Sequence, residues 1–315
     1  MDILVVSGFL GVGKTTFIKE MIKRSNKKFV VLENEYGEVN LDSQEMRQVS
    51  EMEIFEMTEG CVCCTMKDSF ANSIMAISGS LDPDYLIVEP TGIGKLSNII
   101  ENLRKIEYER IRLVGAIAII APNSLLRLEK EYKDIYLDQL KNASHVIFSK
   151  CENEESAFFD KVESQVREQN SHAEIYKGHY KDLPDIWWDE VWGEDSLKEE
   201  IHRQEEEEVN FDRLTLYKGK VNQVGEMVFF LEELLRGKYG NIVRAKGIIA
   251  CRDGQLRFDV ADRLYGIIDG GEYEEKTQCV FIGNPIDKKA LAKALHGRLQ
   301  VAGKRALLSA KKKED

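Results

Sequence analysis

Apolar runs and helical patterns alternate along the first half of the chain. This alternation is typical of parallel β-α-β units. Strands are expected at residues 2–7, 28–35, 53–57, 85–90, 113–120 and 145–150, with a weaker one at 173–178. Helices are expected at 97–105 and at 14–25, where Phe17, Ile18, Met21 and Ile22 share one face. The pattern predicts an α/β domain with a mainly parallel sheet covered by helices on both faces.

A different pattern begins at about residue 180. Residues 180–208 contain all three tryptophans and end in four consecutive glutamates, and we interpret this stretch as an inter-domain linker. Strands are then expected at 213–221, 241–251, 255–260 and 279–283, with helices at 224–236 and 287–295. We predict a first domain over residues 1–200 with a linker to about 210, a smaller α+β domain over 211–298 and a charged tail over 299–315.

The composition of the chain excludes some classes of protein. With 315 residues, 43% hydrophobic and 31% charged, the chain can bury a core and is not mainly disordered. The net charge of −11 argues against wholesale binding of nucleic acid or of anionic membranes. Asp2 stands where a signal peptide would carry basic residues. We therefore expect a cytoplasmic protein that binds neither membrane nor nucleic acid.

The segment GFLGVGKT, residues 8–15, fits the pattern G-x-x-x-x-G-K-[ST] in full and lies between an expected strand and an expected helix. Backbone N–H groups of such a loop surround the phosphates of a nucleotide, and the helix N-terminus adds its dipole. The predicted phosphate-binding residues are Gly8, Gly11, Val12, Gly13, Lys14 and Thr15. We expect Lys14 to reach the β- and γ-phosphates and the Thr15 hydroxyl to bind Mg²⁺.

A phosphate loop of this kind needs a second carboxylate on the metal side, at the end of a neighbouring strand. An apolar strand that ends in Glu89 supplies it, and Gly92 follows with an N–H placed to sense the γ-phosphate. Glu89 stands where many nucleotide hydrolases use aspartate. We therefore predict Lys14, Thr15 and Glu89 as the catalytic residues.

Three of the six cysteines, Cys61, Cys63 and Cys64, occupy four consecutive positions between these two phosphate elements. Adjacent cysteines form a strained disulfide at best, so a disulfide is a poor explanation. Three thiolates close in sequence can converge on one metal ion, and zinc is the most available candidate. Buried structural cysteines are the alternative.

Four motifs in this order resemble the CobW family of P-loop GTPases, which belongs to the class of the nickel-insertion GTPases of hydrogenase and urease. The motifs are GFLGVGKTTF (8–17), ENEYGEVNLD (33–42), GCVCCT (60–65) and IVEPTG (87–92). The segment QLKNASHVIFSKCE (139–152) lies where the family carries its guanine motif. The region after about Arg213 resembles the C-terminal domain of the family.

The resemblance implies Mg²⁺-dependent hydrolysis of GTP, coupled to the binding and delivery of a metal ion, with zinc as the first candidate, to a client protein. It implies that Thr16 joins the phosphate and Mg²⁺ site. Asp42 would belong to a first switch, and Glu89 with Gly92 to a second. The thiols of Cys61, Cys63 and Cys64 would hold the metal, and Ser149, Lys150 and Glu152 would face the base.

This chain departs from the family in two respects. The guanine motif N-K-x-D reads Ser149-Lys150-Cys151-Glu152. Because Glu152 is one methylene longer than aspartate and Ser149 is shorter than asparagine, we expect weaker discrimination of GTP over ATP, with GTP as the first choice and ATP use left open. Many relatives also carry a histidine-rich stretch, which is absent here.

The five histidines are scattered along the chain. His172 and His179, which flank an expected strand, are read as solvated loop residues, with a metal-ligand role as the alternative. Two other functions stay open. The chain would either activate a cofactor enzyme, for example a corrinoid enzyme, or act as a passive zinc-binding protein regulated by nucleotide. Whether it forms a homodimer also stays open.

Overall fold

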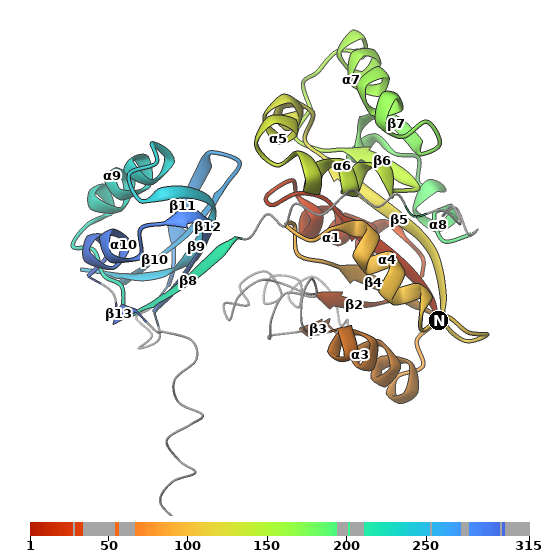
Figure 1. Ribbon diagram of the computed structural model, residues 1–315, viewed down its shortest axis with the longest axis horizontal. Coiled ribbons are helices and arrows are strands. Elements are labelled where there is room, and N and C mark those ends of the chain that lie inside the picture. The colour runs from red at the N-terminus through yellow and green to blue at the C-terminus, as the bar shows by residue number, and fades with distance from the viewer. Residues whose placement is uncertain are drawn as a thin grey trace, which may run out of the picture. The chain divides into compact units, whose positions relative to one another are not determined.

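The computed structural model describes residues 1–27, 29–33, 54–56, 67–193, 201, 211–252, 254–271, 277–296 and 298–299. The chain divides into two compact units, Met1–Val209 and Asn210–Asp315. Figure 1 shows a β-sheet with surrounding helices in each unit. In the part of the chain that the structure describes, no helix is long and apolar enough to cross a membrane.

The first unit is built on a seven-stranded sheet in the order β3-β2-β4-β1-β5-β6-β7, and every paired neighbour in it is parallel. Its strands are β1 (Asp2–Ser7), β2 (Phe29–Glu33), β3 (Ile54–Glu56), β4 (Tyr85–Glu89), β5 (Arg112–Ile120), β6 (His145–Phe148) and β7 (Glu174–His179). The apolar runs of the sequence become these strands because a parallel sheet is buried on both faces. The residues from Ile3 to Val6 in β1, for example, are fully buried.

Helices cover both faces of this sheet. They are α1 (Lys14–Arg24), α3 (Lys67–Ser80), α4 (Leu96–Arg104), α5 (Leu125–Glu131), α6 (Lys133–Lys141), α7 (Ser156–Gln169) and α8 (Trp187–Glu190). The crossover from β1 to β2 runs along the sheet in the direction opposite to the crossovers that follow β3. Right-handed crossovers therefore place α1 on one face and α3, α4, α6 and α7 on the other. The predicted α/β fold is confirmed, and the weak strand at the end of the sheet is present.

The tryptophan-rich stretch differs from the prediction of a linker. Trp188 packs 5.3 Å from the ring of Phe17 on α1, and Trp192 packs 5.6 Å from the ring of Phe29 on β2. Both tryptophans are almost completely buried. Because these indole rings cover the α1 face of the sheet, Trp188 and Trp192 belong to the core of the first unit.

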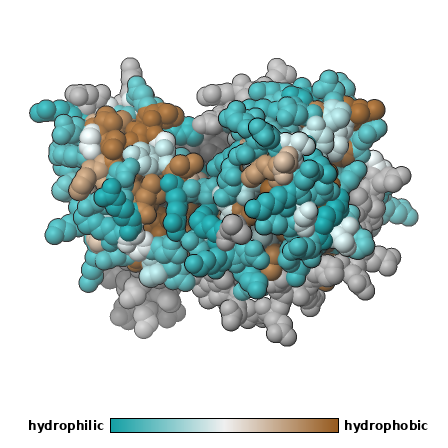
Figure 2. All heavy atoms as spheres, turned by 90° about the horizontal axis from the view of Figure 1, so that it is seen from above, coloured by the Kyte–Doolittle hydropathy of each residue, from teal (hydrophilic) through white to brown (hydrophobic). Residues whose placement is uncertain are grey.

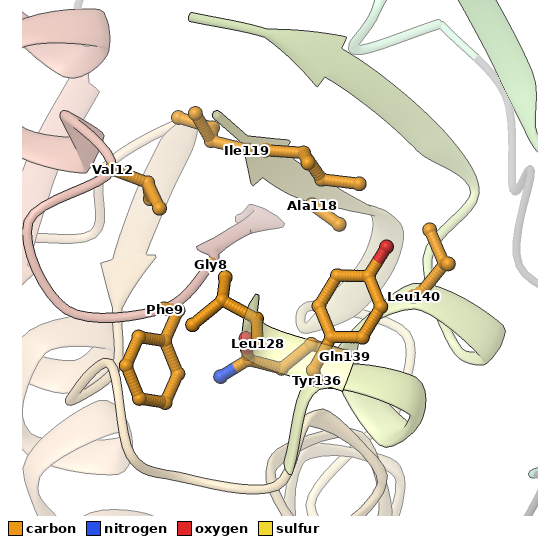
Figure 3. A pocket seen from close by; sticks show the side chains of 10 residues that line it. Gly8, Phe9, Val12, Ala118, Ile119, Leu128, Tyr136, Gln139 and Leu140 are labelled. Atoms are coloured by element: carbon orange, nitrogen blue, oxygen red, sulfur yellow. The ribbon is translucent and has the colours of Figure 1, made fainter. Parts of the chain in front are cut away.

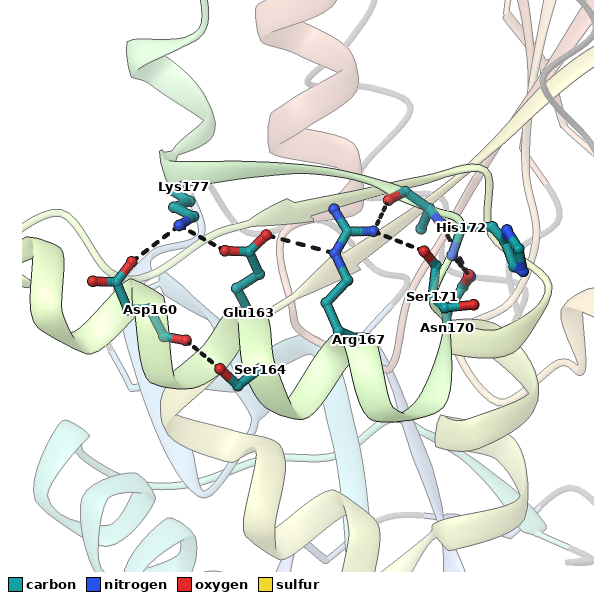
Figure 4. Close-up of polar contacts among 9 residues, drawn as sticks. Asp160, Glu163, Ser164, Arg167, Asn170, Ser171, His172 and Lys177 are labelled. Carbon is teal, nitrogen blue, oxygen red and sulfur yellow. Dashed lines mark hydrogen bonds and ion pairs between the residues drawn. The ribbon is translucent and has the colours of Figure 1, made fainter.

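Helix α7 is tied to strand β7 by a chain of polar contacts (Figure 4). The Lys177 ammonium lies 3.0 Å from a carboxylate oxygen of Asp160 and 2.7 Å from one of Glu163. The Arg167 guanidinium donates to the carbonyls of Ser171 and Ala173, just before β7. These contacts fix β7 along the outer edge of the sheet.

The second unit contains a six-stranded antiparallel sheet in the order β11-β10-β9-β12-β8-β13. Its elements are β8 (Asp212–Tyr217), α9 (Val224–Leu235), β9 (Gly240–Cys251), β10 (Gly254–Ala261), β11 (Leu264–Asp269), β12 (Gln278–Ile286), α10 (Lys288–Ala294) and β13 (Arg298–Leu299). Residues of α9 and α10, such as Phe230 and Leu291, share one core with Phe258 and Phe281 of the sheet. Both helices therefore lie on the same sheet face, as the predicted α+β domain requires.

The sequence analysis did not predict strand β11, because its side chains are either exposed or half buried and form no buried apolar face. Two of its side chains, Leu264 and Ile268, are more than half exposed. Val224, Val228 and Phe229 on α9 are also exposed apolar side chains. Figure 2 shows hydrophobic groups gathered over the second unit in a surface that is otherwise mostly hydrophilic.

Replacing Trp188 with alanine tests the assignment of the tryptophan-rich stretch to the core. Trp188→Ala should lower the free energy of unfolding by about 3–5 kcal/mol, because it removes a fully buried ring. Ile186→Ala, a substitution of a neighbour that is 64% exposed, should change it by less than about 0.5 kcal/mol. Urea unfolding followed by circular dichroism measures both. Equal stabilities of the two variants would contradict the assignment.

Candidate functional site

The loop between β1 and α1 has the backbone geometry that phosphate binding requires. Gly8 has φ 144°, and a Cβ atom there would lie 2.5 Å from the carbonyl oxygen of Ile119 on β5. Only glycine allows the chain to leave β1 this close to the neighbouring strand. Gly11 and Gly13 also have positive φ, and Gly13 is the N-cap residue that directly precedes α1. The loop therefore ends at a helix N-terminus, where N–H groups are available to an anion.

Lys14 is held inside the loop. It is only 8% exposed, and its ammonium donates to the carbonyl oxygens of Gly8 at 3.1 Å and Phe9 at 3.4 Å. These contacts fold the side chain back over the loop that precedes it. A charged ammonium held among polar partners at this place is suited to a phosphate. Thr16 follows on the exposed side of α1.

Thr15 and Glu89 are brought together from positions 74 residues apart. The Thr15 hydroxyl donates to Glu89 Oε1 at 3.0 Å and lies 3.3 Å from Oε2. Strands β1 and β4 are direct neighbours in register, so the start of α1 and the end of β4 meet at one edge of the sheet. A hydroxyl and a carboxylate at this separation form an oxygen donor set of the kind that Mg²⁺ prefers, and these residues fit that ion.

The loop that follows Glu89 packs directly on the phosphate loop. A Cβ atom on Gly92 would lie 2.6 Å from the backbone nitrogen of Leu10. Two residues of α6 hold this loop and the start of α4. Gln139 donates from its amide to the carbonyls of Gly92 at 3.1 Å and Gly94 at 2.9 Å, and Asp138 accepts from the backbone N–H and hydroxyl of Ser97.

Sequence analysis missed Asp138 and Gln139, although both are almost fully buried. Burial raises the pKa of Asp138 above its ordinary value, while the hydrogen bonds from Ser97 oppose that rise. No local motif marks these residues, because their partners lie more than 40 residues away. Their contacts make α6 the support of the loop between β4 and α4.

A small cavity of about 10 Å³ lies behind the phosphate loop, between that loop, β5 and helices α5 and α6 (Figure 3). Phe9, Val12, Ile119 and Leu128 are among its lining residues, and Gln139 contributes a polar group. A space of this size accommodates about one water molecule. The cavity therefore does not hold a nucleotide, which has to bind on the outer side of the loop.

The residues expected near the base lie after β6. Ser149 is buried, and its hydroxyl donates to the carbonyl of Val12 at 2.6 Å, so it fastens the end of β6 to the phosphate loop. Lys150 is exposed and has φ 56°. Glu152 is about half exposed, and its Oε1 lies 3.3 Å from Nε2 of His179. His179 is 4% exposed, so its prediction as a solvated histidine is wrong, whereas His172 is exposed as expected.

Asp42, Cys61, Cys63 and Cys64 lie outside the described residues. Within the described ranges, no group of three or more His, Cys, Asp or Glu side chains could hold a metal ion. Burial raises the pKa of the Cys151 thiol to about 12, helped by nearby carboxylates, and burial raises the pKa of Cys279 to about 12. These two thiols stay protonated at neutral pH, as expected for core cysteines rather than metal ligands.

The sheet register adds a feature that sequence analysis missed. Glu33 on β2 is the register partner of both Glu89 on β4 and Glu56 on β3. Three strands that lie side by side thus each end in a glutamate at the same level. In the sequence, the three apolar runs each stop at a glutamate. That the three glutamates are aligned, however, depends on the order of the strands in the sheet.

Comparison with protein families agrees with this geometry. The model of the CobW/HypB/UreG nucleotide-binding domain matches residues 2–177, and the model of the cobalamin synthesis protein cobW C-terminal domain matches residues 225–299. The first match covers more than half of the chain. The chain belongs to the CobW/HypB/UreG family. The resemblance to CobW P-loop GTPases is confirmed.

Three curated relatives carry names that refer to zinc. The zinc chaperone YeiR of Escherichia coli is 31% identical over 190 residues, which are 57% of this chain and 58% of that protein. The zinc-regulated GTPase metalloprotein activator 1 of Schizosaccharomyces pombe is 27% identical over 59% of this chain and 47% of its own. The matches thus span about half of these two relatives. The zinc chaperone YjiA of E. coli is 23% identical over 94% of this chain and 98% of its own.

Two glycine substitutions test the packing of the loop after Glu89. Gly92→Ala should weaken nucleotide binding by tenfold or more, about 1.4 kcal/mol, because its Cβ would meet the backbone of Leu10 and displace the phosphate loop. Gly79→Ala, in helix α3 with open space around the new Cβ, should leave binding unchanged. Fluorescent-nucleotide titration measures both. Unchanged affinity in Gly92→Ala would show that the two loops move independently.

Proposed function

We propose that this chain hydrolyses GTP in a Mg²⁺-dependent reaction and couples the nucleotide cycle to binding and delivery of zinc to a client protein. The contact between the Thr15 hydroxyl and the Glu89 carboxylate carries the proposal, because it joins the phosphate loop to a strand-end acid. Lys14, already folded over the loop, supplies the positive charge. This is the arrangement expected of a P-loop nucleotide hydrolase.

In this proposal each residue has a separate task. Backbone N–H groups from Gly11 to Thr16 bind the phosphates, and Lys14 exchanges its loop carbonyls for β- and γ-phosphate oxygens. Thr15 and Glu89 would hold Mg²⁺, which would supply positive charge to the phosphates. Gly92 lies against Leu10, and its N–H is available to report the presence of the γ-phosphate.

Zinc is proposed as the cargo, held by Cys61, Cys63 and Cys64. The names of the three relatives support this assignment. The sequence position of the cysteines supports it too, because they fall between β3 and β4, two of the strands that end in glutamates. Three thiolates leave a tetrahedral zinc one open position, which suits an ion that has to be handed on. The client is a protein that offers a stronger or additional ligand.

Substitution of Lys14 tests the chemistry. Lys14→Ala and Thr15→Val should each reduce GTP hydrolysis at least a hundredfold. The expected wild-type rate is on the order of 10⁻⁴ to 10⁻² s⁻¹, the range of GTPases that act without an activating partner. Lys161→Ala, on the exposed side of α7, should hydrolyse GTP at the wild-type rate. Phosphate release under single-turnover conditions is the measurement. A Lys14→Ala variant with wild-type activity would refute the site.

Zinc titration tests the coupling. Zinc affinity should differ about tenfold between the GDP state and a state with a non-hydrolysable GTP analogue, which corresponds to about 1.4 kcal/mol of coupling. By reciprocity, zinc should shift nucleotide affinity by the same factor. The paired variant Cys63→Ser, Cys64→Ser should lose zinc binding, while Cys251→Ser, in the second unit, should keep it. Equal affinities in both nucleotide states would leave zinc binding without a link to the nucleotide.

A further inference from the structure

His179 and Glu152 meet at the edge of the sheet where the base of the nucleotide is expected. His179 is the last residue of β7 and the register partner of Phe148, the last residue of β6. Glu152 follows β6 by a short turn. The chain therefore brings an exposed carboxylate and a buried imidazole together, with 3.3 Å between Nε2 and Oε1.

The hydrogen on the imidazole can be assigned from its surroundings. Nδ1 of His179 accepts from the backbone N–H of Lys181 at 3.2 Å. Burial lowers the pKa of His179 below its ordinary value, against the opposing charge of Glu152, so the ring is neutral near pH 7. A neutral imidazole whose Nδ1 accepts carries its proton on Nε2. The N–H bond thus faces the Glu152 carboxylate.

The imidazole is itself firmly held. The His179 ring lies 4.3 Å from the ring of Tyr180, which is buried against Phe17. The rest of β7 is braced on α7 through Lys177 (Figure 4). Glu152, by contrast, keeps about half of its side chain in solvent. A fixed donor beside a solvent-exposed carboxylate restricts the rotamers of that carboxylate.

We propose that His179 is a positioning residue for base recognition, which holds the Glu152 carboxylate at the orientation that accepts from guanine. The inference rests on the proposed use of GTP. A carboxylate has about four lone-pair sites, so contact with His179 leaves enough of them for the N1–H and 2-amino groups of guanine. The contact offsets the extra methylene of glutamate, whose added freedom would otherwise weaken the preference for guanine.

Nucleotide affinities of the full chain test this role. The proteins are wild type, His179→Ala, His179→Gln and the matched control His172→Ala, and the ligands are GDP, IDP and ADP with Mg²⁺. IDP lacks the 2-amino group. His179→Ala should weaken GDP binding about tenfold, as expected for loss of a polar contact to a charged group, and should leave ADP binding unchanged. His179→Gln, whose amide retains an N–H donor, should recover most of the GDP affinity.

The same measurements in a Glu152→Gln background complete the test. There, His179→Ala should change GDP affinity less than twofold, because the carboxylate it positions is gone. Parallel losses for GDP and ADP, an equal loss in the Glu152→Gln background, or a wild type without guanine preference would overturn the role of His179. A wild type that binds neither GDP nor ADP would instead overturn the proposed function. Thermal unfolding checks that each variant is folded.

Discussion

The hydrogen bond between Thr15 and Glu89 depends on the central constraint of this molecule, the parallel pairing of β1 with β4. Parallel strands bring their carboxyl ends to one edge of the sheet, and β1 and β4 therefore deliver the phosphate loop and the strand-end acid to the same place. A change in strand order would separate the two groups by at least one strand spacing, about 5 Å. Every other feature of the site is arranged around this junction.

Helix α6 gives the junction its support on the other side. Its buried Gln139 is hydrogen-bonded to Gly92 and Gly94 in the segment between β4 and α4, and its buried Asp138 to Ser97 at the start of α4. Buried polar groups of this kind are costly unless they are paired, so the paired arrangement is strongly preferred over partly broken ones. These hydrogen bonds therefore favour one arrangement of the loop beside the phosphate loop.

Much of the fold was predictable because its signals are local. Apolar runs fixed the positions of six strands of the first sheet, and the spacing of apolar residues located α1. Strand β11 escaped because only one of its faces is half buried. The tryptophan-rich stretch was misread because acidic residues follow it closely in sequence, while the packing of Trp188 and Trp192 on Phe17 and Phe29 joins segments more than 160 residues apart.

The sequence by itself determined the phosphate loop, the strand-end Glu89 and the family, since each of these is a short contiguous motif whose backbone geometry follows from its own residues. Tertiary structure alone decided which groups meet. It fastened Ser149 to Val12 across 137 positions, supported Gly92 with Gln139 and placed a buried His179 beside Glu152. Contacts of this kind depend on strand order and register, which are set by the packing of the whole core. A local pattern of residues therefore does not predict these contacts.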